Sequence, residues 1–424
     1  MMLIKNGYLT DPASGMEGEV NILIEDGMIV QIAKTSVAVD EETLVIDATG
    51  LIVAPGLVDT HSHFRDPGFT HKEDLCTGSA AAVKGGYTSV VLMANTNPAV
   101  DSPEVLTDIL RRGKEMPLHI YSCANVTRGL RGEQITDMEA LAKAGAAGFT
   151  DDGIPLLNAD ILREALHRAA ALGLPVSLHE EDKNLIAQNG VNRGEASRAY
   201  GIDGSPREAE FTLIDRDIKI AEETDAALCI QHISTAEGVK LVREARKKYP
   251  NIHAEATPHH FSLTEQAVME KGTLAKVNPP LRTEADRLAI IEALKDGTID
   301  MIATDHAPHT REEKAQSIEK APSGMLGLET ALSLAIRELV KPGYMTMCEM
   351  LANFTCNPAD FYHLPAGRVE VGAAADLVLF DPEEEWIVTE EFASKSSNSP
   401  FIGETMPGVI HYTIADGRIV YRNQ

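Results

Sequence analysis

Residues 56–65 read Gly-Leu-Val-Asp-Thr-His-Ser-His-Phe-Arg, and they complete an apolar run that begins at residue 51. The run at 51–58 predicts a buried strand. Side chains alternate along an extended chain, so His61 and His63 are expected to point the same way just beyond the strand. Two imidazoles on one face can bind one metal ion, and imidazole suits zinc. Arg65 has the same parity and could hold an anionic substrate through two hydrogen bonds.

Strand and helix patterns alternate through the whole middle of the chain. The predicted strands cover residues 51–58, 87–93, 118–124, 147–150, 175–178, 227–233, 252–256 and 301–304. The predicted helices cover residues 103–115, 137–144, 159–172, 205–223, 236–248, 284–296 and 327–339. Eight strands alternating with helices are typical of an α/β protein with a (β/α)8 TIM barrel.

The two ends of the chain have a different pattern from the middle. Short strands separated by turn signals such as Asn6-Gly7 and Asp26-Gly27 occupy the N-terminal part, and Asp416-Gly417 marks a similar turn near the C-terminus. The sequence therefore predicts a small β-sandwich domain formed by residues 1–53 and 365–424. The barrel is expected to occupy residues 54–364.

Side chains that can bind metal follow most of the predicted barrel strands. In such barrels the chemistry lies at the carboxyl ends of the strands. The polar residues found at those ends are His61, His63, Asn95, Asp151, Asp152, His179, His232, His259, His260, Asp305 and His309. Metal-ligand types that recur at one rim predict a metal site there.

The size of the ligand set favours two metal ions over one. A tetrahedral zinc accepts four ligands, whereas this rim offers His61, His63, His179, His232, Asp305 and a carboxylate from Asp151 or Asp152. Two ions bridged by that carboxylate can share a hydroxide and bring its pKa near neutrality. Asp305 could accept the proton of the hydroxide and pass it to a leaving nitrogen. His259 or His260 could be packed beside the site instead of binding metal.

The composition excludes several other classes of protein. The chain has 64 acidic and 38 basic residues, a formal charge of −26, which argues against non-specific binding of nucleic acid. Its five cysteines are scattered, as expected for reduced thiols in the cytoplasm. The first residues lack the apolar core of a signal peptide, and no apolar run is long enough to span a bilayer. We therefore expect a cytoplasmic protein that acts on a small molecule, away from membranes.

Taken together, the motifs resemble those of the amidohydrolase superfamily, and within it most closely the bacterial class I dihydroorotase family. The matching segments are residues 55–68, 71–74, 95–98, 148–153, 276–282, 303–309, 372–378 and 417–421. The resemblance covers essentially the whole chain. It departs at Ala94, where the family usually has proline. It implies the zinc-dependent interconversion of N-carbamoyl-L-aspartate and L-dihydroorotate, a cyclic amide, in pyrimidine (UMP) biosynthesis.

The resemblance also implies a role for each site residue. One zinc ion would be held by His61, His63 and Asp305, and a second by His179 and His232, with Asp152 and a hydroxide as bridges. Asp151 remains the adjacent alternative to Asp152. The residues expected to bind substrate are His63, Arg65, Asn95, Asn278, His309, Ser323 and Gly324. Asp305 is the expected catalytic residue.

Two other functions remain open from the sequence. The first is another cyclic amidohydrolase, an allantoinase or hydantoinase, although members of those families usually carry a carboxylated lysine where this chain has aspartate after strand four. The second is a non-catalytic, dihydroorotase-like partner of aspartate carbamoyltransferase. The family also suggests a homodimer. Finally, the charged segment 310–323 is either a mobile flap over the site or a solvated connection.

Overall fold

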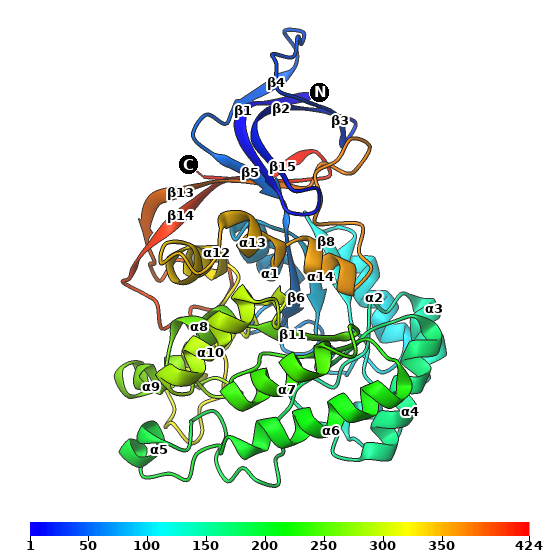
Figure 1. Cartoon of the computed structure of the whole chain (residues 1–424), viewed down its shortest axis with the longest axis vertical. Helices are drawn as coiled ribbons and strands as arrows, with labels where there is room; N and C mark the ends of the chain where they lie inside the picture. The colour runs from blue at the N-terminus through cyan, green and yellow to red at the C-terminus, as the bar shows by residue number, and fades with distance from the viewer. Residues whose placement is uncertain (424) are drawn as a thin grey trace.

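The computed structural model describes residues 1–423 as two packed parts, a barrel and a sheet built from both ends of the chain (Figure 1). The sheet lies at one end of the longest axis, and the barrel with its helices fills the other end. None of the helices in residues 1–423 combines the length and the hydrophobicity that a membrane crossing needs. The α/β class and the barrel predicted from the sequence are confirmed.

Parallel strands form the wall of the barrel. They are β6 (Leu57–Ser62), β7 (Tyr87–Leu92), β8 (His119–Ser122), β9 (Val176–Leu178), β10 (Leu228–Ile230), β11 (Ile252–Ala256) and β12 (Met301–Ile302). Three pair in the order β6-β7-β8, and four pair in the order β12-β11-β10-β9. The predicted fourth strand contracts to Phe149, which bridges Ala124 on one side and Val176 on the other. A bridge between Ser62 and His306 closes the ring.

The single strand predicted for residues 51–58 is wrong, because the segment forms two strands in two sheets. β5 (Ile52–Pro55) pairs with the terminal strands, whereas β6 begins at Leu57 in the barrel. The chain crosses between them at Gly56, where an added Cβ would lie 2.1 Å from Oγ1 of Thr88. Only glycine allows the backbone to pass so close to that side chain. The chain therefore passes from the terminal sheet to the barrel at Gly56.

Helices cover the outside of the barrel. The longer elements are α1 (Leu75–Lys84), α2 (Pro103–Gly113), α3 (Met138–Ala144), α4 (Ala159–Leu172), α6 (Glu208–Thr224), α7 (Ala236–Arg246), α10 (Glu284–Lys295) and α12 (Ala331–Ala335), which continues into η3 (Ile336–Val340). The shorter elements are η1 (Arg128–Leu130), α5 (Glu195–Tyr200), α8 (Pro258–Ser262), α9 (Glu265–Lys271), η2 (Gly272–Ala275), α11 (Arg311–Lys314), α13 (Met347–Ala352) and α14 (Cys356–Phe361). Helix α4 illustrates the local signals: the side chain of Asn158 caps its start, and Gly173 ends it in the left-handed conformation.

The terminal strands form one eight-stranded sheet. They are β1 (Met2–Asp11), β2 (Met16–Glu25), β3 (Met28–Ala33), β4 (Leu44–Asp47), β5, β13 (Leu377–Ile387), β14 (Thr405–Ala415) and β15 (Arg418–Arg422). The order is β15-β14-β13-β5-β1-β2-β3, and β4 pairs with β1. Residues from both ends, such as Ile22 and Leu377, share a core that is separate from the barrel core.

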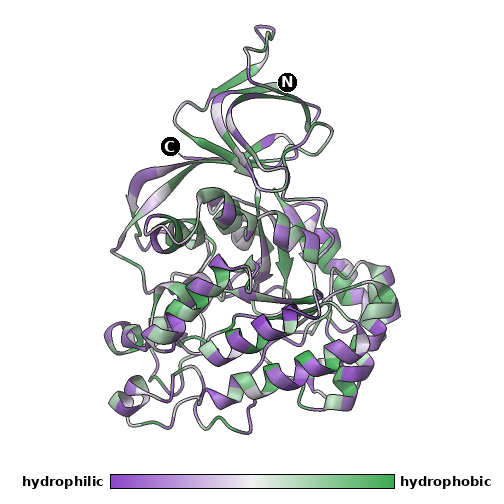
Figure 2. Cartoon of the chain, viewed as in Figure 1, coloured by the Kyte–Doolittle hydropathy of each residue, from purple (hydrophilic) through white to green (hydrophobic). Residues whose placement is uncertain are grey.

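Burial follows the hydrophobic pattern of each element. All residues of β6 and β7 are buried, as expected for strands covered on both faces. In Figure 2 the helices α6 and α7 carry hydrophilic and hydrophobic residues side by side along their length. Their apolar residues, including Ile214, Ile218, Val239 and Val242, are buried against the rest of the fold. This packing fixes the strand ends, where the polar residues gather.

Candidate active site

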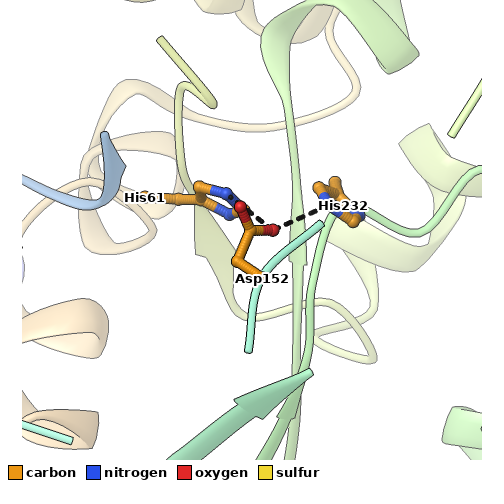
Figure 3. Close-up of side chains that lie close together, drawn as sticks. All are labelled: His61, Asp152 and His232. Carbon is orange, nitrogen blue, oxygen red and sulfur yellow. Dashed lines mark ion pairs between the residues drawn. The ribbon is translucent and has the colours of Figure 1, made fainter. Parts of the chain in front are cut away.

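The predicted metal ligands come together at the carboxyl ends of the barrel strands. His61 lies at the end of β6, His232 follows β10, and Asp152 follows the position of strand four. Figure 3 shows the carboxylate of Asp152 between the rings of His61 and His232, which point toward it from opposite sides. All three side chains are buried. Ligand atoms of these three residues lie within 4.8 Å of one another.

A first group of ligand atoms surrounds Asp305. Its Oδ1 atom lies 3.0 Å from Nε2 of His63 and 3.5 Å from Nε2 of His61. Ligand atoms of these three residues also lie within 4.8 Å of one another. The His-x-His pair therefore points to one place, as the alternation of an extended chain predicts.

A second group of ligand atoms contains those of His179 and His232. Nδ1 of His179 lies 3.0 Å from Nε2 of His232, and each of these atoms is 3.8 Å from Oδ1 of Asp152. The same Oδ1 atom is 3.4 Å from His61, whereas Oδ2 is 3.5 Å from His63. Asp152 thus lies between the two groups and faces both.

Asp151 points away from these groups. Its carboxylate accepts hydrogen bonds from the backbone N–H groups of Val126, at 2.9 Å, and Thr127, at 3.1 Å. The side chains of Thr127 and Asn125 also donate to it. Asp151 therefore anchors the loop after β8, and of the two neighbouring aspartates only Asp152 lies in the ligand cluster.

The donor set fits a metal ion. Zinc–nitrogen and zinc–oxygen bonds of about 2.0–2.1 Å in a tetrahedron place two ligand atoms roughly 3.3 Å apart. The separations of 3.0–3.5 Å around Asp305 match that spacing. Nε2 of His61, which faces Asp152 and Asp305, is buried and forms no hydrogen bond with the described residues. Buried polar atoms are rarely left without a partner, so this nitrogen indicates a further ligand.

The backbone at the site is strained at three positions. Arg65, His232 and Asp305 have φ angles of 57°, 32° and 46°, in the left-handed region that non-glycine residues seldom adopt. Such conformations cost on the order of 1–3 kcal/mol each and persist where the surroundings over-determine them. The fold therefore maintains strain in order to aim these three side chains into one space.

Carboxylates behind the ligands orient the imidazoles. Glu255, on β11, lies 2.6 Å from Nδ1 of His61, and Glu181 lies 3.2 Å from Nε2 of His179. Asp59 accepts from the backbone N–H and the hydroxyl of Thr304, which ties β6 to the segment that carries Asp305. The sequence analysis missed Glu255 and Asp59. A charged residue inside an otherwise apolar strand is the signal that could have identified both.

The electrostatic environment keeps the carboxylates ionised. Burial raises the pKa of Asp152, but the neighbouring charge of His61 and the close imidazole of His232 bring it well below its usual range. Burial lowers the pKa of His61, yet the carboxylates of Glu255 and Asp152 raise it well above its ordinary value. The close imidazole of His63 and the nearby histidines likewise outweigh burial and lower the pKa of Asp305. Ionised carboxylates attract cations, as a metal site requires.

A cavity of about 210 Å³ opens over the ligand cluster. The residues that line it are His63, Arg65, Asn95, Asp152, Gly153, His179, His232, Asn278, Asp305, Ala307, His309, Ser323 and Gly324. The structure thus brings every predicted substrate-binding residue to this cavity, and His61 lies buried beside it. Nε of Arg65, Oδ1 of Asn278 and Oγ of Ser323 are buried without a hydrogen-bond partner among residues 1–423. These atoms can serve a ligand that carries both acceptors and donors.

Internal hydrogen bonds fix the cavity wall. Asn95 accepts from Nδ1 of His63 at 3.0 Å and donates to Oδ2 of Asp152 at 3.0 Å. His309 donates from Nε2 to the carbonyl oxygen of Ser323 at 2.9 Å. Burial and the charges of Arg65 and Lys72 lower the pKa of His309 to about 2. The imidazole is therefore neutral at physiological pH.

His259 and His260 are packed beside the site. His260 contacts Oγ1 of Thr257 at 2.7 Å and the carbonyl oxygen of Pro279 at 3.0 Å. His259 is buried, and neither residue lines the cavity. The predicted alternative of a packing role agrees with these contacts.

A (β/α)8 barrel with a terminal sheet and a cluster of histidines and aspartates at the strand ends defines the amidohydrolase class of hydrolases. A family model described as dihydro-orotase-like matches residues 50–238. The chain is 48% identical to a dihydroorotase of Clostridium acetobutylicum over 425 residues, with 100% of both chains covered. It is 50% identical to a dihydroorotase of Lactococcus lactis subsp. lactis over 421 residues, with 99% of both covered. The chain belongs to the dihydroorotase family and is an enzyme.

Solved structures share the fold at lower identity. An L-hydantoinase (dihydropyrimidinase) from Arthrobacter aurescens superposes with a TM-score of 0.88 at 25% identity, covering 99% of this chain and 96% of its own. A dihydropyrimidinase from Brevibacillus agri gives a TM-score of 0.87 at 24% identity, with coverages of 100% and 95%. These likenesses confirm the arrangement of a barrel with a β-rich domain.

Proposed function

We propose that this enzyme is a dihydroorotase that interconverts L-dihydroorotate and N-carbamoyl-L-aspartate in de novo pyrimidine biosynthesis. Hydrolysis breaks the cyclic C–N amide bond, adds the oxygen of water to the carbonyl carbon and transfers a proton to the nitrogen. The observation that carries the proposal is one cavity that contains both a metal-ligand cluster and an arginine. The substrate needs both, because it contains an unreactive amide and a carboxylate.

The proposed cofactor is a pair of Zn²⁺ ions. His61, His63 and Asp305 would hold one ion, His179 and His232 the other, and Asp152 would bridge them. Bound zinc lowers the pKa of water and polarises a carbonyl oxygen. The position of Asp152 between the two groups of ligand atoms supports this assignment.

The other cavity residues would bind and orient the substrate. Arg65 and Asn95 would hold its carboxylate beside His309, and the free Oδ1 atom of Asn278 would accept from the ring amide. The backbone at Ser323 and Gly324 would complete the contacts. Asp305, which borders both the cavity and the ligand cluster, would accept the proton of the attacking water and deliver it to the leaving nitrogen.

The hydantoinase and allantoinase alternative is less well supported. The dihydroorotases match at 48–50% identity, whereas the hydantoinase and dihydropyrimidinase structures match at 24–25%. A hydantoin ring without a carboxylate would leave the buried Nε atom of Arg65 without a partner, which is costly. A non-catalytic role is disfavoured because the complete set of ligands is in place.

Ring opening of L-dihydroorotate by the purified protein tests the proposal. We expect a loss of ultraviolet absorbance that stops on chelation and returns with added zinc, and a metal content near two ions per chain. Allantoin and hydantoin serve as controls and should react far more slowly. A zinc-loaded protein that leaves dihydroorotate unchanged would contradict the proposal and favour a role that depends on aspartate carbamoyltransferase.

Replacement of Arg65 by methionine tests the carboxylate contact. Loss of a charge-assisted, bidentate pair is expected to raise KM for dihydroorotate by about 10- to 100-fold. The methionine side chain retains most of the apolar packing of the arginine stem. Steady-state kinetics of the zinc-loaded variant provide the measurement, and Arg111→Met, on the exposed side of α2, is the matched control. An unchanged KM would exclude Arg65 from substrate binding.

Location and assembly also belong to the proposal. We place the enzyme in the cytoplasm, where pyrimidine precursors are made, and expect it to form a homodimer or to associate with aspartate carbamoyltransferase. Light scattering of the protein alone, and then with that enzyme added, distinguishes these states. A monomer that is fully active under both conditions would rule out a required partner.

A further inference from the structure

The segment at residues 311–324 forms one wall of the cavity. It follows His309 and ends with Ser323 and Gly324, which both line the site. Helix α11 is the only regular element in it, yet Lys314, Ile318, Ala321 and Gly324 are buried. A solvated connection does not bury residues in this way. The burial therefore indicates that something holds the segment against the barrel.

Two buried lysines bind the backbone of this segment. Nζ of Lys276 donates to the carbonyl oxygens of Ile318 and Ala321, both at 2.7 Å. Nζ of Lys314 donates to the carbonyl oxygens of Pro322, at 3.0 Å, and Gly324, at 2.9 Å. The two side chains are only 2% and 4% exposed. Four carbonyl groups near the cavity are thus bound to ammonium groups instead of water.

This arrangement is costly for an ordinary loop. Within residues 1–423 neither ammonium group forms an ion pair with a carboxylate, so carbonyl dipoles alone replace the lost water. Burial lowers the pKa of Lys276 to about 8 and that of Lys314 to about 7, which reflects the cost of removing each charge from water. A loop could leave the same carbonyl groups in solvent at no such cost. The positions of these carbonyl groups must therefore matter.

The lysines also connect to the substrate-binding residues. The backbone N–H of Gly324 donates to the carbonyl oxygen of Lys276 at 2.9 Å, and Asn278 follows Lys276 by two residues. An added Cβ at Gly190 would lie 2.3 Å from Oγ of Ser323 and 2.8 Å from Cε of Lys276. Ser323 and Lys276 are thus packed closely against Gly190 as well. Movement at either lysine would displace Ser323 and Gly324 together.

We propose that Lys276 and Lys314 are positioning residues that hold residues 311–324 as a preformed wall of the cavity. The wall presents Ser323, whose Oγ has no partner among residues 1–423, and the adjacent Gly324, together with His309, before the substrate binds. The free energy of substrate binding then does not include the entropic cost of ordering the segment. This inference rests on the proposed function for the identity of the substrate. It gives a fixed wall in place of the two predicted alternatives, a mobile flap or a solvated connection.

The test uses the zinc-loaded full chain with Lys276→Met or Lys314→Met, which retain side-chain length and remove the donors. Lys320→Met, at an exposed position of the same segment, is the matched control. The amides of Lys320 and Ala321 bond to the carbonyl oxygen of Ser317 at 3.0 and 2.8 Å and report on the segment. Without substrate, their hydrogen exchange should accelerate about tenfold or more in both test variants. KM for dihydroorotate should rise about tenfold, with kcat within about threefold of wild type.

The two readouts keep the outcomes distinct. Unchanged exchange in a folded test variant overturns the proposal, and if one variant fails to fold the other decides. Faster exchange with an unchanged KM also overturns it, because the wall would then not position the substrate. If the wild-type chain fails to convert dihydroorotate, the proposed function fails, whereas exchange still shows whether the lysines hold the segment.

Discussion

Replacement of Asp305 by asparagine is expected to reduce the turnover of dihydroorotate by about 10³-fold or more, because a positioned proton acceptor contributes on the order of 10²–10⁴-fold and this one also faces the metal ligands. Asparagine is close to aspartate in size and keeps one oxygen near Nε2 of His63, which in the wild type is 3.0 Å from Oδ1. It cannot accept and release a proton at neutral pH. The measurement is kcat for ring opening, with the zinc content of the same sample determined in parallel.

The control for this variant is Glu312→Gln, at an exposed position of α11 near the same rim. It should leave kcat within about twofold, since surface substitutions of this kind change little. An Asp305→Asn enzyme that keeps its metal and more than about a tenth of wild-type turnover would exclude Asp305 as the proton acceptor. Loss of zinc together with activity would instead assign Asp305 chiefly to metal binding.

Much of the barrel could be predicted because its strands and helices follow simple patterns. Buried parallel strands are continuous apolar runs, and polar residues placed directly after them lie at one rim. This reasoning brought His61, His179 and His232 to the same site, although they are far apart in the sequence. It required no knowledge of how the helices pack.

The errors arose where tertiary contacts, and not local pattern, decide the outcome. The apolar run at 51–58 continues through Gly56 without a break in hydrophobicity. Its division between two sheets depends on the close packing of Thr88 against Gly56, which only the structure shows. Glu255, on β11, contacts His61, on β6, at a separation of 194 residues. A charge inside an apolar strand could have identified Glu255 as unusual, but it does not indicate which histidine the carboxylate contacts.

The segment after strand eight shows a further limit. The charged composition of this segment predicts exposure. Yet the ammonium groups of Lys314, within the segment, and Lys276, before it, are buried and donate to backbone carbonyl oxygens. A lysine in sequence normally indicates solvent, because its ammonium is seldom buried. The burial of Lys276 and Lys314 depends on the path of the whole segment, which the sequence pattern does not determine.

Substitution of each of the two adjacent aspartates is expected to separate metal binding from stability. Asp152→Asn should weaken zinc binding by about 100-fold or more and lower the zinc content below two ions per chain, because its carboxylate faces four imidazoles from two groups. Asp151→Asn should retain the zinc. Its cost should be about 1–3 kcal/mol in the free energy of unfolding, because an amide cannot accept at both oxygens from Val126 and Thr127.

The two substitutions control for each other, since both remove one charge from buried neighbouring positions. Metal analysis after dialysis against a weak chelator measures the first effect, and urea unfolding of the metal-free proteins measures the second. The reverse result, with zinc lost from Asp151→Asn and kept by Asp152→Asn, would exchange the roles of the two residues. Equal loss from both would mean that the loop anchored by Asp151 determines the position of Asp152, because the peptide bond between them transmits any displacement of that loop directly to the ligand cluster.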